Sequence, residues 1–384
     1  MFLDSILEET GLSRTALSAL YAVGSGISAV MVTVVSRQAD RYGPRRILLV
    51  VAILLASSCM LMAASFSLVT FIIAFAALRA FGQGSLPING TLLVGQWFVR
   101  YRGRALAIMG LGFTASTAAL PPVSRLLIDT LGWRQAYVAL GVMVLVLLVP
   151  ATWALVRDRP EDIGLGPDGD ALLDAPLSSD TTKGRGPAHD TRPIFTSPAF
   201  WMLALPLSTA PFVVTALVFH QAGIFSEQGL DADIAAATFV PYAIANAPVV
   251  IVAGTLIDRF GPRPLFVAAM TLLLAALAVA QVVSSLPLAI LYGAILGATG
   301  GASQVISGFT WAHFYGREGL GRVQGSGTMV GIAGAALGPL PLAALEVQFG
   351  GFGPAIALMM ALPLAAIVAM LLARPKVTSL SAST

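Results

Sequence analysis

Long apolar stretches dominate the chain, and short polar segments separate them. Eleven stretches are close to the roughly 20 apolar residues that an α-helix needs to cross a bilayer. They lie near 16–36, 47–64, 68–98, 105–126, 135–156, 199–222, 235–257, 265–284, 287–311, 324–345 and 352–373. Because the stretches are continuous rather than alternating, they favour helices over the strands of a membrane barrel. The pattern predicts an all-α polytopic membrane protein with eleven visible spans.

The composition is that of a protein in lipid. Hydrophobic residues make up 57% of the 384 positions and charged residues 11%, whereas a soluble domain carries roughly 25% charged residues. The pI of about 9.2 could suggest a nucleic-acid partner, but the basic residues lie in short loops between spans. We therefore expect the lipid bilayer, and no nucleic acid, as a partner. The single cysteine, Cys59, excludes an intrachain disulfide.

The basic residues also predict an orientation. Of the 22 Lys and Arg residues, 18 lie at 37–46, 100–104, 157–192, 259–263, 317–322 and 374–376, all on one side of the predicted bundle. The positive-inside rule makes that side cytoplasmic. Eleven spans then place the C-terminus in the cytoplasm and the N-terminus outside. We expect an integral protein of a bacterial inner membrane.

Part of the sequence recurs at a fixed offset. Asp40 Arg41 returns as Asp258 Arg259, and Gly43 Pro44 Arg45 returns as Gly261 Pro262 Arg263, each 218 positions later. Both copies fall on the cytoplasmic side, so the repeats run parallel. The predicted domains are a five-span bundle at 1–156, a polar cytoplasmic linker at 157–198, a six-span bundle at 199–374 and a tail at 375–384. Pro121 Pro122 and Gly338 Pro339 lie at equivalent places and predict interrupted helices.

The repeat predicts one helix that the first half does not contain. The span at 199–222 has no partner, because Met1 aligns with Phe219. We therefore expect two six-helix repeats of which the first lacks its first helix. Either that helix is absent or the natural start lies upstream of Met1, and the intact loop up to Met1 favours a truncated sequence.

The segment 36–46, with Asp40, Arg41, Gly43 and Arg45, resembles the signature loop of the major facilitator superfamily, and 254–263 is its second copy. In that loop a Gly stands four positions before Asp-Arg. Gly254 keeps it, whereas Ser36 replaces it, which predicts a looser helix contact. The resemblance implies a transporter whose loops stabilise one access state. It assigns a gating role to Asp40, Arg41, Arg45, Asp258, Arg259 and Arg263, although such charges also set topology in any inner loop.

Finer motifs are similar to the monocarboxylate porter and oxalate:formate antiporter branch. They are Trp97 Phe98 with Arg102 Gly103 Arg104, then Gly132 Trp133 Arg134, and the run Arg-Pro-Glu-Asp-Ile-Gly-Leu at 159–165. This similarity implies a carboxylate substrate. In that branch the helix that corresponds to 235–257 supplies an Arg to the carboxylate, but here it carries no charge before Asp258. An exporter of drugs or neutral metabolites is therefore an alternative.

Arg79 is the only basic residue deep inside a predicted span. A charge in the membrane costs a few kcal/mol or more and marks functional sites. We predict that it binds an anionic substrate, with Gly82 and Gly84 allowing close approach. The alternative is a structural Arg that neighbouring carbonyls satisfy.

Other polar residues inside spans extend the predicted substrate site. They are Gln83, Asn89, His220, Gln221, Asn246 and Gln304. Each could instead bond a neighbouring helix. No acidic residue lies in the middle of a span, so coupling to protons would use His220 or the missing helix, or would be absent.

No motif for phosphate binding, zinc hydrolysis or a nucleophilic serine occurs in the sequence, which predicts neither an enzyme nor a cofactor or metal site. The sequence predicts a secondary active or facilitative transporter, acting as a monomer, that moves a small organic solute by alternating access. A carboxylate anion is the expected solute, and protons are a further candidate partner. A receptor or inactive remnant that lacks helix 1 is the alternative outside the transporter class.

Overall fold

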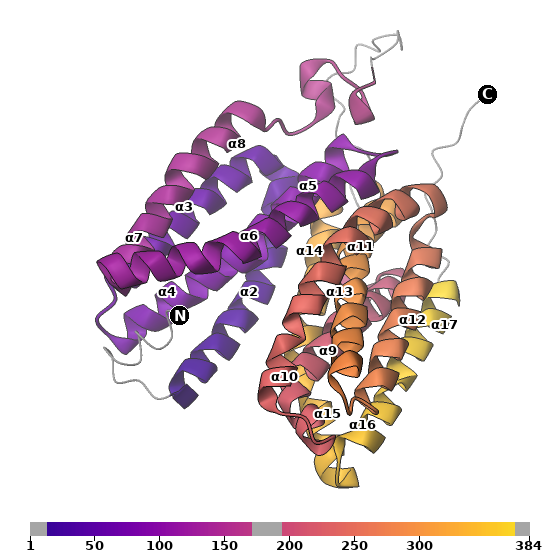
Figure 1. The fold of residues 1–384 in the computed structure, drawn as a ribbon. Helices are drawn as coiled ribbons and strands as arrows, with labels where there is room; N and C mark the ends of the chain where they lie inside the picture. The colour runs from indigo at the N-terminus through magenta and orange to yellow at the C-terminus, as the bar shows by residue number, and fades with distance from the viewer. Residues whose placement is uncertain (1–13, 171–193, 373–384) are drawn as a thin grey trace, which may run out of the picture. The chain divides into compact units, whose positions relative to one another are not determined.

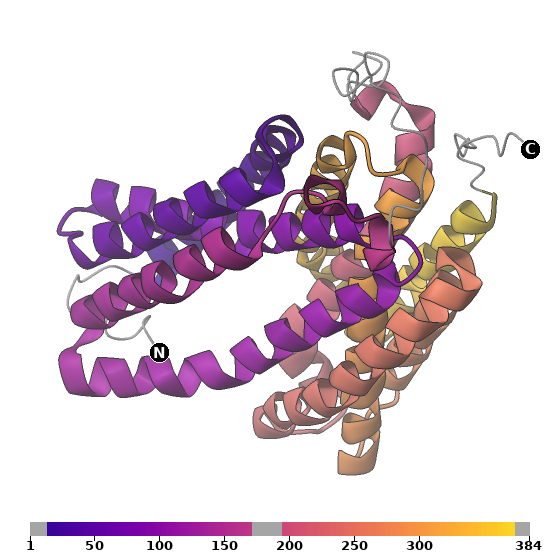
Figure 2. The same cartoon turned by 90° about the horizontal axis from the view of Figure 1, so that it is seen from above.

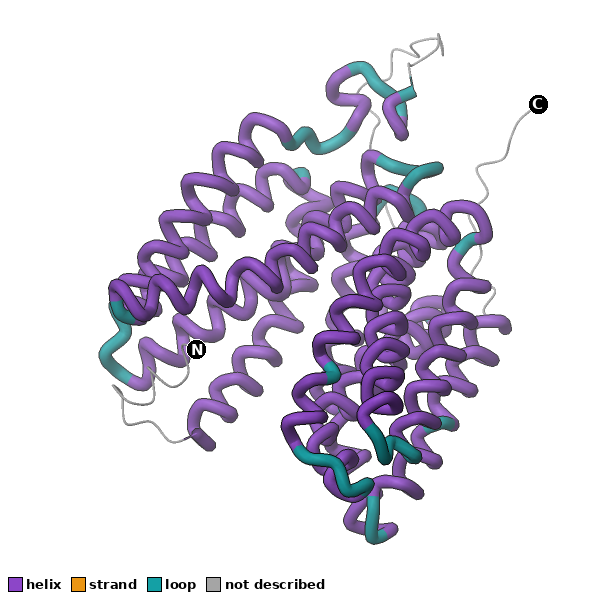
Figure 3. Tube along the Cα trace, viewed as in Figure 1, coloured by secondary structure: helices purple, strands orange, loops and turns teal. Residues whose placement is uncertain are grey.

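The computed structural model describes residues 14–170 and 194–372, and the regular elements in these ranges are helices (Figures 1 and 3). The chain start, the middle of the predicted linker and the predicted tail at 375–384 lie outside the described residues.

The first half of the sequence forms α2 (Arg14–Tyr42), α3 (Pro44–Ala63), α4 (Leu68–Leu78), η1 (Arg79–Ser85), α5 (Leu86–Trp97), α6 (Arg102–Leu131), α7 (Trp133–Met143), η2 (Val144–Leu148) and α8 (Val149–Leu155). Three short 3₁₀ turns follow, η3 (Pro160–Ile163), η4 (Pro167–Gly169) and η5 (Ile194–Thr196).

The second half forms α9 (Pro198–Glu227), α10 (Ala232–Ala237), α11 (Phe239–Phe260), α12 (Pro262–Ala280), α13 (Leu286–Tyr315), α14 (Leu320–Leu337), α15 (Pro339–Phe349), α16 (Phe352–Met359) and α17 (Ala361–Leu372) (Figure 2).

Helix boundaries repeat at the offset of 218 residues that the sequence shows. Helix α3 begins at Pro44 and α12 at Pro262, and α4 begins at Leu68 where α13 begins at Leu286. The turns before α3 and α12 use Gly43, with φ of 89°, and Gly261, with φ of 77°. Only glycine adopts such angles readily, and the Pro that follows starts the next helix because it needs no N–H donor there.

Within the described residues, nine helical segments are long and apolar enough to cross a membrane. Nine of the predicted spans coincide with them. The other two predicted spans, 16–36 and 105–126, lie in α2 and α6, which are helices of 29 and 30 residues. The prediction of an all-helical membrane protein is confirmed.

One predicted interruption is wrong. Helix α6 continues through Pro121 and Pro122, whereas Gly338 separates α14 from α15 as expected. Neighbouring groups in membrane proteins can satisfy the carbonyls that Pro leaves without a donor, so a Pro pair need not end a helix.

The chain divides into two compact units that differ from the two sequence halves. Unit 1 comprises the described residues of Met1–Val99, Gly112–Asp190 and Arg317–Met329, and unit 2 comprises those of Arg100–Leu111, Thr191–Gly316 and Val330–Thr384. The start of α6 therefore belongs to unit 2, and the start of α14 belongs to unit 1. Each unit has its own buried core, with Met62, Phe71 and Trp133 in unit 1 and Phe225 and Tyr292 in unit 2.

Candidate functional site

Arg79 begins η1, a seven-residue π-helix between α4 and α5. These three elements form one apolar segment, Val69–Trp97, that is long enough to span a membrane. The arginine therefore lies inside the span and not at its end. Single π turns inside α-helices are rare and frequently occur at functional sites. The sequence signal for this turn is weak and consists of Gly82 and Gly84.

One face of α2 packs against the π turn. The Ser28 hydroxyl donates a hydrogen bond to the Arg79 carbonyl, 3.1 Å away. A methyl group added to Gly24 would lie 3.4 Å from Arg79 Cγ, and one added to Gly84 would lie 2.6 Å from the Ser28 hydroxyl oxygen. Gly24 and Ser28 are four residues apart and so share a helix face. This face fixes the backbone that carries Arg79.

The two other predicted substrate residues of unit 1 differ in accessibility. Gln83 is exposed on η1, four positions after Arg79. Asn89 is fully buried, and its Nδ2 donates to the Ser85 carbonyl at 2.8 Å. Gln83 is therefore exposed on the surface of unit 1, whereas the Asn89 amide bonds the backbone of the preceding turn.

In unit 2, three predicted substrate residues bond the backbone of other helices. Because a carbonyl oxygen only accepts, His220 Nε2 donates to the Pro339 carbonyl at 3.0 Å. Buried Gln221 donates to the Ala235 carbonyl at 2.6 Å, and Asn246 donates to the Gly297 carbonyl at 3.1 Å. These bonds match the alternative that such residues tie helices together.

Gln304 differs from these three residues because its side chain is exposed on α13. It lies near Gly110, where an added methyl group would be 3.3 Å from the Gln304 Oε1. Gln304 is therefore a predicted substrate residue whose side chain is accessible.

Each signature-loop aspartate caps the start of a long helix. In unit 2, Asp258 accepts hydrogen bonds from the backbone N–H groups of Gly103, at 2.6 Å, and Arg104, at 3.0 Å. These residues lie in the first turn of α6, where backbone donors lack intrahelical partners and the helix dipole is positive. A carboxylate is well matched to that position.

Unit 1 contains the equivalent contact. Asp40 accepts from the N–H groups of Gly321 and Arg322 in the first turn of α14, at 2.8 and 2.7 Å. All three positions correspond to Asp258, Gly103 and Arg104 at the same offset of 218 residues. The same local chemistry is thus used twice.

The predicted gating arginines make different contacts. The Arg45 N–H donates to Asp158 at 2.7 Å, and its guanidinium donates to the Trp153 carbonyl. Arg41 lies over the adjacent Tyr42 ring, 5.2 Å from its centroid. The remaining two, Arg259 and Arg263, lie over the rings of Phe260 at 5.2 Å and Phe314 at 5.8 Å.

The expectation that Ser36 loosens a helix contact is wrong. Gly325 of α14 faces Ser36, and a methyl group added to Gly325 would lie 2.6 Å from Ser36 Cβ. In unit 2 the corresponding pair is Gly254 and Ala107, where an added methyl group would also lie 2.6 Å from the partner Cβ. The missing glycine is compensated because the opposite residue has become glycine.

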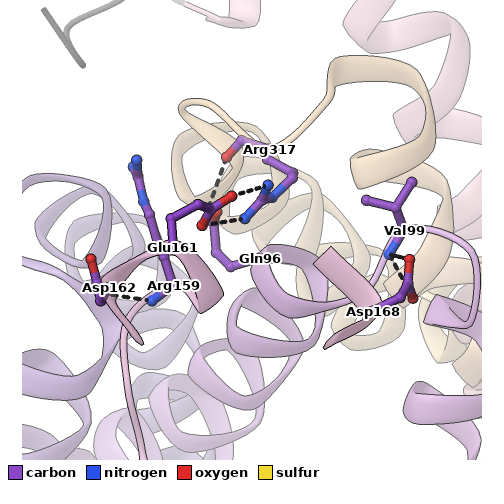
Figure 4. A network of polar contacts seen from close by, with 7 residues as sticks. All are labelled: Gln96, Val99, Arg159, Glu161, Asp162, Asp168 and Arg317. Atoms are coloured by element: carbon purple, nitrogen blue, oxygen red, sulfur yellow. Dashed lines mark hydrogen bonds and ion pairs between the residues drawn. The ribbon is translucent and has the colours of Figure 1, made fainter. Parts of the chain in front are cut away.

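Glu161 and Asp168, near the start of the linker, bond the loops that precede α14 and α6 (Figure 4). Glu161 forms an ion pair with Arg317, with oxygen to nitrogen distances of 2.8 and 3.2 Å, and Gln96 Nε2 donates to the Arg317 carbonyl at 2.8 Å. Asp168 accepts from the Val99 N–H at 3.2 and 3.3 Å. Val99 and Arg317 are equivalent in the repeat, 218 positions apart.

Sequence reasoning noted the motif that contains Glu161 but not its partner. Burial by itself raises the pKa of Glu161, but hydrogen bonds and positive charge from Arg317, together with the charge of Arg159, outweigh it. The pKa of Glu161 therefore lies below its ordinary value, and the carboxylate is ionised at neutral pH.

A polar cavity of about 370 Å³ adjoins this network, with Asp40, Arg46 and Arg317 among its lining residues.

The family model of the Major Facilitator Superfamily matches residues 1–248 and 215–383, which together cover nearly the whole chain. The chain belongs to the Major Facilitator Superfamily. Membership of this superfamily explains the doubled signature loop.

Curated relatives match part of this superfamily member. A "Probable L-galactonate transporter" of Escherichia coli (strain K12) is 28% identical over 44% of this chain and 37% of its own length. The "Membrane sensor protein UhpC" of Salmonella typhimurium is 27% identical over 42% of this chain and 37% of its own length. The matched region thus spans well under half the length of either relative.

A solved structure shares the fold. The human organic anion transporter MFSD10 (TETRAN) gives a TM-score of 0.70 at 18% identity and covers 96% of this chain and 88% of that chain. At this identity the likeness establishes the major facilitator fold alone.

Proposed function

We propose that this superfamily member is a secondary active or facilitative transporter that moves a small organic carboxylate by alternating access. The observation that carries the proposal is Arg79, a permanent positive charge within an apolar span and on a π turn. Burying that charge costs a few kcal/mol or more. A guanidinium binds a carboxylate strongly, because two parallel charge-assisted hydrogen bonds form.

One curated relative supports the class of solute. L-galactonate carries a carboxylate, and it appears in the name of a relative that is 28% identical over part of the chain. In the proposed site, Arg79 binds the carboxylate, and the exposed side chain of Gln83 bonds another polar group of the solute.

The loop contacts supply the proposed gate. Asp40 and Asp258 each bond two N–H groups at a helix start. The Arg45–Asp158 bond and the Glu161–Arg317 ion pair involve loops of the same unit. A state that keeps these bonds is favoured over one that breaks them, so weakening them shifts the populations of the access states. The side with these loops is proposed to be cytoplasmic, in a bacterial inner membrane, with the protein acting as a monomer.

Uptake into proteoliposomes tests the role of Arg79. We expect Arg79→Ala to lower kcat/KM for labelled galactonate by about 100-fold, the cost of a lost charged hydrogen-bonded pair. Arg125→Ala is the matched control, because the Arg125 side chain is 73% exposed and pairs with nearby Asp129. Equal galactonate uptake by the parent and Arg79→Ala proteins would remove Arg79 from the mechanism.

The choice of solute class needs a separate assay. Lactate, oxalate, glucose and a hydrophobic cation are offered as competitors of galactonate uptake. Competition by carboxylates supports the proposal, whereas competition by the hydrophobic cation alone favours the drug exporter.

A pH gradient applied to the same vesicles shows whether protons move with the solute, and His220→Ala shows whether that histidine carries them.

A non-transporting solute sensor is the second candidate. The similarity to UhpC, which is named a membrane sensor protein, favours it. A sensor would bind galactonate to purified protein with no counterflow in vesicles, whereas a transporter shows both binding and counterflow.

A further inference from the structure

Two side-chain hydroxyls hold the π turn at its first two carbonyls. Ser28 of α2 donates to the Arg79 carbonyl at 3.1 Å, and Ser85, within the turn, donates to the Ala80 carbonyl at 2.8 Å. Both serines are buried, with exposed fractions of 3% and 0%. A π turn breaks the regular hydrogen-bond pattern of the helix, so these donors stabilise it directly.

The Ser28 bond is unusual within this chain. Ser36, Ser57 and Ser58 each donate to the carbonyl four residues earlier in their own helix. That local bond is the common choice for a helical serine. Ser28 instead donates across 51 positions to a different helix. Its hydroxyl therefore links α2 to the backbone of Arg79 rather than to its own helix.

The equivalent helix of unit 2 lacks the π turn. At the offset of 218 residues, Gly297 replaces Arg79, and α13 continues as an α-helix from Leu286 to Tyr315. The hydrogen bond to this carbonyl is present in both units. Asn246 is the counterpart of Ser28 and donates to the Gly297 carbonyl at 3.1 Å. Ser303, the counterpart of Ser85, has no hydrogen-bond partner for its buried hydroxyl. Between these two equivalent helices, the second donor bond is found in the one that forms the π turn.

The π turn determines the direction of Arg79. Each residue advances an α-helix by about 100°, so one extra residue in a turn rotates α4 against α5 by about that angle. Helix α5 is held by its buried side chains Ile88 and Leu92. If the turn relaxed to α-helix, Arg79 would point to a different side of the span.

We propose that Ser28 and Ser85 are positioning residues that hold the π turn and thereby aim the Arg79 guanidinium at the carboxylate of the solute. The inference rests on the proposed function, in which Arg79 binds that carboxylate. Neither serine touches the solute. Gly24 packs beside the same segment, since an added methyl group would lie 3.2 Å from Phe75 Cδ1 and 3.4 Å from Arg79 Cγ.

A double-mutant cycle distinguishes an effect on the direction of the Arg79 side chain from a loss of overall protein stability. Ser28→Ala should raise the KM for galactonate about tenfold with kcat nearly unchanged, and it should have no further effect in the Arg79→Ala protein. Ser303→Ala is the matched control and should leave uptake unchanged. A Ser28→Ala effect of equal size in both backgrounds, or an equal effect of Ser303→Ala, would overturn the inference.

A second measurement needs no transport. In a Cys59→Ser background, the thiol of Gln83→Cys reports the rotation of the exposed face of the turn through its rate of labelling by a soluble maleimide. Ser28→Ala and Ser85→Ala should each change that rate at least about threefold, and Ser303→Ala should not. An unchanged rate refutes the positioning role even if Arg79 binds the solute. If Arg79→Ala leaves uptake intact while the rate changes, the proposed function fails and the control of the turn by the serines stands.

Discussion

The helix pair α2 and η1 in unit 1 and the pair α11 and α13 in unit 2 solve one packing problem in opposite ways. In unit 1 the small residue is Gly24, and Arg79 occupies the space beside it. In unit 2 the small residue is Gly297, and its counterpart of Gly24 is Tyr242, whose backbone lies directly against Gly297. Close approach of two helices needs one small partner, but either helix can supply it.

The choice of which residue is small has a functional consequence. In unit 2, Gly297 lets the backbones of α11 and α13 approach closely, and α13 remains a regular helix. In unit 1, placing Gly on α2 leaves the opposite position open for a long charged side chain, and the helix there forms a π turn. A repeat can thus keep its helix arrangement while only one copy carries the proposed anion site.

The largest expected effect comes from closing the space in unit 2. Gly297→Ala should lower the free energy of unfolding by about 3 kcal/mol, because the added methyl group meets the rigid Tyr242 backbone and not a movable side chain. Thermal unfolding in detergent measures the loss. Gly331→Ala is the control, since open space surrounds Gly331, and it should be neutral. Equal unfolding temperatures for both variants would contradict the comparison.

A smaller effect is expected at the exchanged pair of the signature loop. Gly325→Ala should cost about 1–2 kcal/mol of unfolding free energy, because the methyl group meets the Ser36 side chain. Ser36→Gly should restore most of this loss when combined with it, since it recreates the Gly254–Ala107 arrangement of unit 2. A combined variant as unstable as Gly325→Ala alone would show that the two pairs are not equivalent.

The two capping aspartates should respond alike. Asp40→Asn and Asp258→Asn should each lower the unfolding free energy by about 1 kcal/mol, because an amide has one acceptor oxygen for two backbone donors and no charge for the helix dipole. Thermal unfolding of both variants, with Asp129→Asn as an exposed control, measures the effect. If only one variant lost stability, the two contacts would contribute unequally to the free energy of unfolding.

The smallest effect concerns the Glu161–Arg317 ion pair of unit 1. The pKa of Glu161 is lowered, so the pair stabilises the protein above the ordinary pKa of a glutamate, and this contribution is lost as the pH falls through the lowered pKa. Glu161 is 42% exposed, which limits the contribution to about 0.5 kcal/mol. Unfolding temperatures of the parent and Glu161→Gln proteins should differ at neutral pH and converge in acid. A constant difference across that range would exclude the ion pair as its cause.

Several features of the site were beyond prediction because they depend on residues far apart in the chain. The motif at 159–165 was visible, but its partner Arg317 lies 156 positions after Glu161. The buried state of Asn89 and Gln221 was equally hidden, since hydropathy does not tell which side of an apolar helix faces its neighbours. Gly325 could have been found by comparing the two copies at Ser36, because its counterpart Ala107 is larger.

The sequence by itself determined the membrane-spanning helices, the parallel repeat and the membership of the superfamily, because apolar length and a fixed offset are properties of the chain read in order. It also singled out Arg79, because a single sequence is enough to show a charged residue within an apolar span. Only the tertiary structure decided that Arg79 starts a π turn, that Ser28 bonds its carbonyl, and that Asp40 and Asp258 cap distant helices. Each of these facts depends on which helices come together, and hydrogen-bond partners 51 to 282 positions apart leave no local pattern.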